Sequence, residues 1–144
     1  MTSTVQAEDF DLGGEGIAYH DMEAANQGGQ YRTTDGVDIE ATTDTGGGFN
    51  VGWTAATEYL VYTTSNAATV GTVNLRVAST AAQTVHVEVD GVNVSGTINV
   101  PNTTGWQTWQ TVSKTLTTTV PAGTHLVRIV LDSGGINLNW FSFN

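Results

Sequence analysis

The sequence predicts an all-β protein built as a β-sandwich. Short stretches in which apolar and polar residues alternate recur along most of the chain, as expected for half-buried strands. Turn-forming residues separate these stretches, and no segment has the period of an amphipathic helix. A chain of 144 residues can bury a core and is short enough for one unit, so we expect a single domain over residues 1–144.

The first strand is predicted at Val5–Phe10, where polarity alternates. In a strand, Gln6 and Glu8 would point to the same face. They either line a solvated edge or share a donor or cation that satisfies them. No regular element is predicted for the glycine-rich, acidic segment 11–38. A loop is expected at Gly46–Gly48, since glycine adopts backbone conformations that other residues avoid.

The second half of the chain carries the clearest strand patterns. The Asp90-Gly91 pair lies between two alternating runs, which is typical of a tight β-hairpin. The Pro121–Gly123 segment predicts another turn. The strands predicted after residue 58 are 59–62, 73–77, 85–89, 92–94, 97–100, 106–116, 125–131 and 138–143.

Three tryptophans lie beside predicted loops. Trp53 follows the glycine loop and is either a contact platform or a core residue. Trp106 and Trp109 are three residues apart, so in a strand they would face opposite sides. We expect Trp106, next to Gly105, to be exposed and Trp109 to enter the core.

Charge and composition restrict the partners. The net charge is −10 with only four basic residues, so the chain would repel phosphate backbones and we expect no nucleic-acid partner. There is no apolar run of membrane-spanning length and no basic, apolar leader, so we expect no membrane partner. A solvated surface is the simplest explanation for the acidic first part. Abundant Thr, Asn and Gly with little Lys suit a secreted bacterial domain. We also expect a monomer.

Four motifs together resemble a family 6 carbohydrate-binding module. They are VQAEDF at the start, TDTGGGFNVGW in the middle, then GWQTW, and GGINLNWF near the end. The resemblance covers nearly the whole chain in the right order. It implies a jelly-roll β-sandwich without catalytic activity, attached to a secreted polysaccharide-degrading enzyme. Many such modules grip a sugar ring between two aromatic side chains at one end of the sandwich.

The resemblance also implies the residues of the site. The two aromatic positions correspond to Trp53 and Trp106, the carboxylate to Glu40 and the sugar-binding amide to Asn137. Tyr31, in the insertion-like segment 13–38, is expected to add a wall to the cleft. Indole faces suit the apolar faces of a pyranose, and a carboxylate accepts hydroxyl donors strongly. We expect modest affinity, of order 10 µM to 1 mM.

The family also implies a structural calcium ion. Residue matching assigns it to the side chains of Gln6, Glu8 and Asn139 and to a backbone carbonyl near Phe49. All of these are oxygen donors, which calcium prefers. The expected ligand is the terminal sugar of a glycan, with β-1,3-glucan (laminarin) first, agar second, and xylan or cellulose also open.

Two alternatives belong to other functional classes. A small glycoside hydrolase would need a pair of carboxylates about 5–10 Å apart, and the sequence offers no evident partner for Glu40. The three histidines lack metal-ligand spacing, and no nucleophile motif is present. A purely structural spacer domain would instead bury Trp53 and Trp106.

Overall fold

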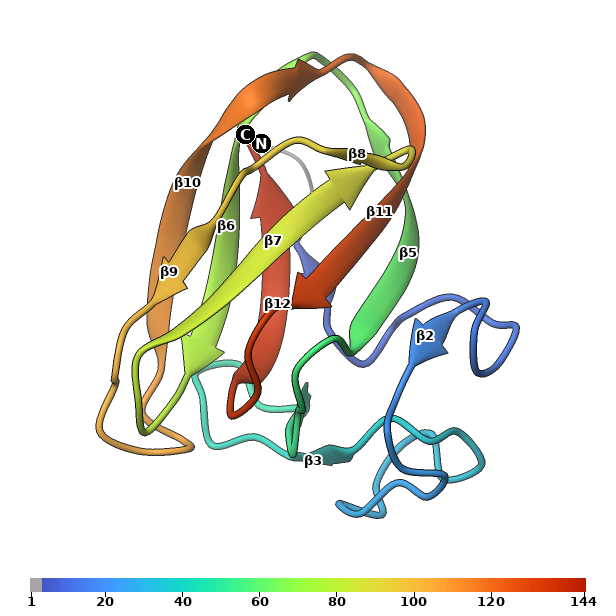
Figure 1. Cartoon of the computed structure of the whole chain (residues 1–144), viewed down its shortest axis with the longest axis vertical. Helices are drawn as coiled ribbons and strands as arrows, with labels where there is room; N and C mark the ends of the chain where they lie inside the picture. The colour runs from blue at the N-terminus through green and yellow to red at the C-terminus, as the bar shows by residue number, and fades with distance from the viewer. Residues whose placement is uncertain (1–3) are drawn as a thin grey trace.

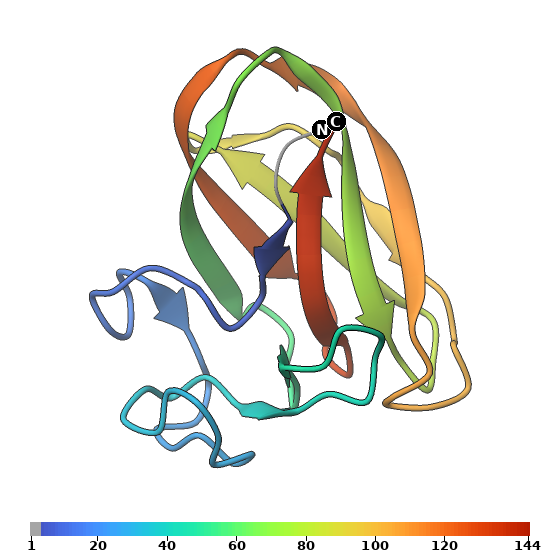
Figure 2. The same ribbon diagram turned by 180° about the vertical axis from the view of Figure 1, so that it is seen from behind.

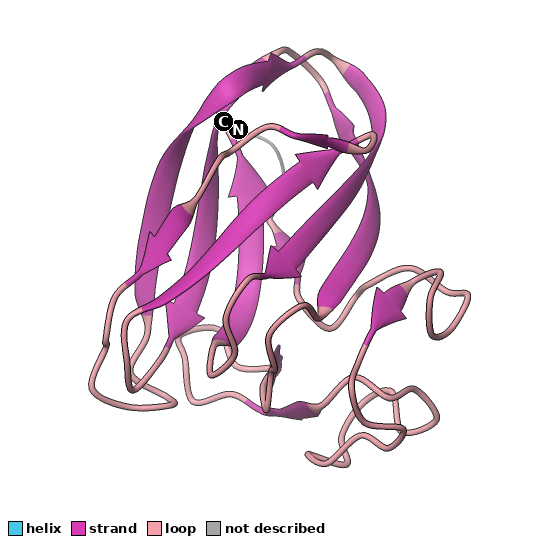
Figure 3. Ribbon diagram, viewed as in Figure 1, coloured by secondary structure: helices cyan, strands magenta, loops and turns pink. Residues whose placement is uncertain are grey.

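The computed structural model describes residues 4–144 and confirms the all-β sandwich (Figure 3). Strands alternate with turns and loops throughout, and no helix long and apolar enough to cross a membrane occurs within these residues. The strands are β1 (Val5–Gln6), β2 (Tyr19–His20), β3 (Ile39–Ala41), β4 (Phe49–Val51), β5 (Tyr59–Asn66), β6 (Val70–Ala78), β7 (Gln83–Val89), β8 (Val92–Asn93), β9 (Ile98–Val100), β10 (Gln110–Val120), β11 (Gly123–Leu131) and β12 (Asn137–Phe143).

Two antiparallel sheets make up the sandwich (Figure 1). The first has the order β10-β6-β12-β4-β3, and β1 pairs with β12 as an additional strand. The second has the order β2-β5-β11-β7-β8, with β9 also paired to β7. The view from behind shows β1 beside β12, and β12 beside β6 (Figure 2). The first and last strands therefore lie side by side.

The core is built from the alternating positions that predicted the strands. Val73, Leu75 and Val77 on β6 are fully buried, and Ile129 on β11 of the second sheet belongs to the same buried cluster. Their neighbours in sequence point outward, as the two-residue period of a strand requires. The two sheets also meet through aromatic rings, since Tyr62 packs edge-on against Phe141 at 4.8 Å between ring centroids.

The first strand is shorter than the sequence predicts. The Asp9 N–H donates to the Gln6 carbonyl at 3.1 Å, so the chain turns directly after Gln6. Ala7 and Glu8 are buried within that turn. The expectation that Glu8 lies on the strand face with Gln6 is therefore wrong, because turn formation interrupts the alternation.

The segment 11–38 folds without a regular ladder beyond β2. Side-chain groups take the role of strand pairing here: Asn26 Oδ1 accepts the N–H groups of Gly29 and Ile39, both at 2.9 Å. The buried Asp38 carboxylate accepts the Gln27 N–H at 2.5 Å. Such contacts satisfy backbone donors in an irregular segment.

Several of the loops that connect the strands gather at one end of the sandwich (Figure 1). Segments 42–48, 52–58, 101–109 and 132–136 meet there, at the lower end of the view. Residues far apart in sequence are thus brought together at this end.

Candidate functional site

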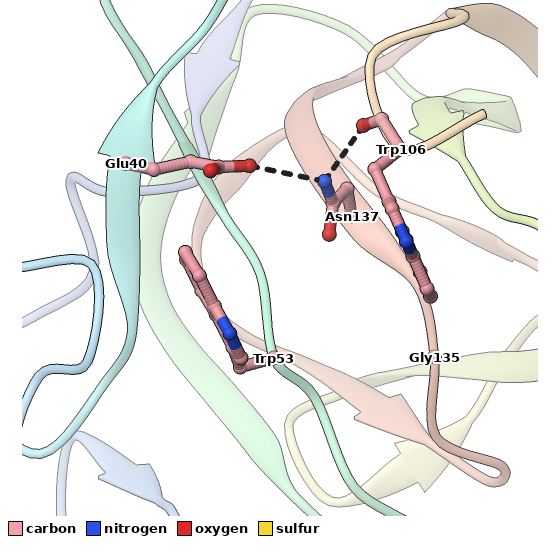
Figure 4. A pocket seen from close by; sticks show the side chains of 5 residues that line it. All are labelled: Glu40, Trp53, Trp106, Gly135 and Asn137. Carbon is pink, nitrogen blue, oxygen red and sulfur yellow. Dashed lines mark hydrogen bonds between the residues drawn. The ribbon is translucent and has the colours of Figure 1, made fainter.

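A cleft of about 250 Å³ opens at the loop end of the sandwich. Its lining residues come from four separate segments and are Glu40, Trp53, Trp106, Gly135 and Asn137 (Figure 4). The cleft brings together four of the five residues expected from the sequence to contact a sugar. Its volume is near the lower end for small-ligand pockets, roughly 300–1,000 Å³, so it suits one or two sugar rings.

Two indoles form the walls. Trp53 is 51 % exposed and Trp106 is 47 % exposed, so neither is a core residue. In Figure 4 both rings are seen edge-on, with their faces turned toward the space between them. Large apolar side chains exposed in one hollow are a feature of ligand-binding surfaces. This exposure argues against the spacer-domain alternative.

Trp109 is not a core residue, contrary to the prediction. It is half-buried, and its indole N–H donates to Gln107 Oε1 at 3.2 Å. The cause is local: Thr108 N–H donates to the Gly105 carbonyl, so residues 105–108 form a turn and β10 begins only at Gln110. The strand alternation that placed Trp109 in the core does not apply to a turn.

The backbone around the walls depends on glycine. A Cβ at Gly52 would lie 3.0 Å from Asn137 Oδ1, so a larger residue would crowd the amide. Gly135 has φ 77°, and a Cβ there would lie 3.7 Å from the Trp106 ring. The next residue after Gly52, Trp53, itself adopts a left-handed backbone with φ 47°. This conformation is uncommon for a bulky residue and is found preferentially at functional positions.

Glu40 lies at the floor of the cleft, held by amide groups. It is on β3, directly opposite Asn50 on β4. Its Oε1 accepts three N–H groups: from Gln107 Nε2 at 2.8 Å, and from Asn50 Nδ2 and Asn137 Nδ2 at 3.2 Å each. The three donors come from different segments, so they fix the carboxylate relative to both walls.

Asn137 begins β12 and is only 3 % exposed. Its Nδ2 donates to Glu40 Oε1 at 3.2 Å and to the Trp106 carbonyl at 2.7 Å. Both amide hydrogens are therefore used within the protein. Of the side-chain amide of Asn137, only the oxygen is left free to accept a hydrogen bond from a ligand.

Tyr31 does not reach the cleft. Its ring stacks against Phe49 at 5.1 Å between centroids, and its Oη donates to Asp9 Oδ1 at 2.6 Å. This hydrogen bond and the Asp9 charge raise the pKa of Tyr31. The expectation of a third wall from Tyr31 is corrected, because these two contacts hold it beside the turn that contains Glu8.

The residues expected to bind calcium lie where β1 meets β12. Gln6 pairs with Trp140, and Ala7 N–H donates to the Asn139 carbonyl. Glu8 Oε2 and Asn139 Oδ1 are buried oxygens without a hydrogen-bond partner among the described residues. Burial raises the pKa of Glu8 to about 7, and backbone N–H groups of Glu8 and Phe49 lower it only partly.

Two buried acceptors without donors are costly unless a cation satisfies them. Residues 4–144 contain no group of three His, Cys, Asp or Glu side chains arranged for a metal. The expected set has a single carboxylate, with amide and carbonyl oxygens as its other members. Its chemistry fits calcium, which accepts all three oxygen types.

Comparison with known proteins gives a consistent picture. Residues 27–144 match the model of the carbohydrate binding module (family 6). The chain belongs to this family. Family 6 modules are non-catalytic and bind carbohydrates.

Two solved family 6 structures are similar over nearly their whole length. A β-1,3-glucan-binding module from Bacillus halodurans is 26 % identical with a TM-score of 0.76, covering 99 % of this chain and 96 % of that one. A module of Cellvibrio mixtus lichenase 5A, in complex with cellotriose, is 34 % identical with a TM-score of 0.75, covering 100 % and 98 %.

A longer relative also contains a similar segment. The clotting factor G alpha subunit of Tachypleus tridentatus is 32 % identical over 118 residues, or 79 % of this chain. The chain spans 17 % of the length of that curated relative.

Sequence reasoning missed the residues behind the floor. Gln107 and Asn50 do not line the cleft, yet both donate to Glu40. Gln107 lies between the two tryptophans of GWQTW, and Asn50 follows the glycine loop. Their positions within the two aromatic motifs were the available signal.

Proposed function

We propose that this module captures the terminal glucose of a β-glucan, with β-1,3-glucan as the favoured ligand, in the cleft between Trp53 and Trp106. The observation that carries the proposal is the pairing of two half-exposed indoles over a floor of Glu40 and Asn137. A pyranose presents apolar faces to the walls and a rim of hydroxyls to the floor. The similar β-1,3-glucan-binding module from Bacillus halodurans supports this choice of ligand.

The physical chemistry supports end capture with modest affinity. Burial of apolar sugar surface contributes about 25 cal/mol per Å². A hydrogen bond from a hydroxyl group to a carboxylate is stronger than a hydrogen bond between two neutral groups. A cleft of about 250 Å³ holds few sugar units, so the contact surface is small. The entropy lost when the ligand and side chains are ordered offsets much of the contact energy. We therefore expect a dissociation constant of order 10 µM to 1 mM.

We also infer a structural calcium ion at the junction of β1 and β12. The support is the pair of buried, unpartnered oxygens, Glu8 Oε2 and Asn139 Oδ1. Gln6 and the backbone carbonyl of Phe49 would complete the set. Bound there, calcium would supply the positive charge that these oxygens lack and link the first and last strands.

The biological role follows from the ligand. We infer that the module directs a glycoside hydrolase in the same polypeptide to its polysaccharide. We infer that the module acts outside the cell, in keeping with a composition rich in Thr, Asn and Gly and poor in Lys. In this role the cleft holds the substrate chain and leaves bond cleavage to the partner domain.

Affinity electrophoresis against laminarin, agarose, xylan and soluble cellulose derivatives tests the proposal. Laminarin should retard the module most strongly. The module should release no reducing ends from any of the polysaccharides. Retardation only by agarose or xylan would contradict the β-glucan assignment. Stronger binding to cellulose derivatives than to laminarin would retain a β-glucan but reject the favoured linkage.

A further inference from the structure

The hydrogen-bonding capacity of Glu40 Oε1 is filled from within the protein. Three N–H donors reach this one oxygen, the closest being Gln107 Nε2 at 2.8 Å. A carboxylate oxygen has about two lone pairs, so Oε1 has no capacity left for a ligand. Oε2 accepts none of the hydrogen bonds found among the described residues. It is therefore the oxygen available to a sugar hydroxyl.

The orientation of the Gln107 amide is fixed on both sides. Its Oε1 accepts the Thr43 N–H at 2.9 Å and the Trp109 indole N–H at 3.2 Å. Its Nε2 donates to Glu40 Oε1 and, at 3.0 Å, to Asn50 Oδ1. A flipped amide would direct NH₂ at two donors and oxygen at two acceptors, which is unfavourable. Gln107 can therefore only donate toward Glu40.

Asn137 is fixed by the same logic. Its two N–H groups face Glu40 Oε1 and the Trp106 carbonyl, so a flip would place its oxygen against two acceptors. Figure 4 shows the Asn137 oxygen pointing into the space between the two indoles. The side chains of the floor thus present two acceptors, Glu40 Oε2 and Asn137 Oδ1, and no donor.

We propose that Gln107 and Asn50 are positioning residues that make the cleft floor accept hydrogen bonds only, so that it selects a neutral sugar end donating two hydroxyl groups. This inference rests on the proposed glycan binding. An acceptor-only floor rejects a fluorine in place of a recognised hydroxyl, because fluorine cannot donate. It also rejects a terminal uronic acid, whose carboxylate would face Glu40 without a cationic side chain among the lining residues.

The first test uses the wild-type protein and calorimetry. Laminaribiose is compared with derivatives in which single hydroxyls of the non-reducing glucose are replaced by hydrogen or by fluorine. At two positions the deoxy sugar should bind at least about tenfold more weakly, and the fluoro sugar should be equally weak. Recovery of affinity by fluorine at those positions would overturn the inference.

This experiment separates the inference from the proposed function. Binding of laminaribiose in the expected range together with recovery of affinity by fluorine would reject only the acceptor-only floor. If neither laminaribiose nor cellobiose binds at all, the proposed function fails, and the inference fails with it. If cellobiose binds more tightly than laminaribiose, the deoxy and fluoro derivatives of cellobiose are compared instead. Equal weakness of the two would support the inference, and recovery of affinity by fluorine would overturn it.

The second test addresses Gln107 through Gln107→Glu, with Gln110→Glu on exposed β10 as the control of equal charge change. A carboxylate at residue 107 would face Glu40, and two adjacent carboxylates bind a shared proton. At about pH 8 this variant should bind at least about tenfold more weakly than the wild type. The affinity of Gln107→Glu should rise as the pH falls to about 5.5, whereas the affinities of the control and the wild type should not rise.

A purely structural role for Gln107 would give a different result. Thermal melting of Gln107→Glu establishes that the variant is folded at both pH values. Wild-type affinity at about pH 8, or an equal loss at both pH values in the folded variant, would overturn the role assigned to Gln107.

Discussion

The side-chain amide of Asn139 donates to Asp44 Oδ2 at 2.8 Å, and this bond leaves Asn139 Oδ1 as a buried acceptor without a partner among the described residues. Arg76 fixes Asp44 through two bonds, at 2.7 and 2.6 Å. The Arg76 guanidinium also holds the pKa of Asp44 below its ordinary value. The orientation of Asn139 is therefore set by a charged pair, with its oxygen turned away from that pair.

Calcium should stabilise the protein, because an ion that binds only the folded state shifts unfolding by mass action. At a free calcium concentration of about one hundred times the dissociation constant, the free energy of unfolding should rise by about 2.7 kcal/mol. This corresponds to roughly 5–10 °C in Tm. Glu8→Gln should abolish the response to calcium, whereas Glu23→Gln, at an exposed residue, should retain it. Melting curves in chelated and calcium-containing buffer measure this. An identical Tm in both buffers would exclude the ion.

Glu40→Gln should weaken glycan binding while preserving the shape of the cleft. The new amide would turn its oxygen to the three N–H groups that now donate to Glu40 Oε1, so an NH₂ group would replace Oε2. The charge-assisted hydroxyl bond would then be lost, at a cost of about 1–2 kcal/mol, or roughly five- to thirtyfold in affinity. Glu40→Ala should cost more, and Glu23→Gln should have no effect. Calorimetry with laminarin oligosaccharides provides the comparison. Equal affinity of the wild type and Glu40→Gln would remove this carboxylate from the binding site.

His125 should make stability depend on pH. Its Nδ1 lies 2.7 Å from Asp90 Oδ2, and this hydrogen bond raises the pKa of His125 above 6.5. A raised folded-state pKa means that the contribution is complete below the unfolded value and is lost as the pH rises through the folded value. The Tm difference between wild type and His125→Gln should therefore be larger near pH 5.5 than near pH 8.5. A difference independent of pH would contradict this pairing.

The sequence predicted the regular parts of the fold because their residues alternate strictly. Residues 85–89 were expected as a strand and lie within β7, and the Asp90-Gly91 turn joins β7 to β8. Both Asp90 and Gly91 have positive φ, as such turns require. Side-chain alternation is a local property, so it can be recognised in a short stretch of sequence without knowledge of the rest of the chain.

The residues that sequence reasoning misplaced are held by turns and side-chain contacts that strand alternation does not reveal. Tyr31 is held by Asp9 and Phe49, and Trp109 by the turn and Gln107. Gln107 donates to Glu40 across 67 positions of sequence, and its place within GWQTW marks the residue but not this partner. Motif matching located the residues that line the cleft, whereas the amide network behind it required the three-dimensional arrangement.

Calorimetric titration of laminaritriose tests the claim that a sugar ring binds between Trp53 and Trp106. Wild type, Trp53→Ala and Trp106→Ala are compared with Trp140→Phe, whose residue on β12 does not line the cleft. Each cleft variant should lose about 2 kcal/mol of binding, roughly thirtyfold, while its Tm stays within a few degrees. Trp140→Phe should bind like wild type. Wild-type affinity in a folded Trp53→Ala or Trp106→Ala protein would contradict the claim.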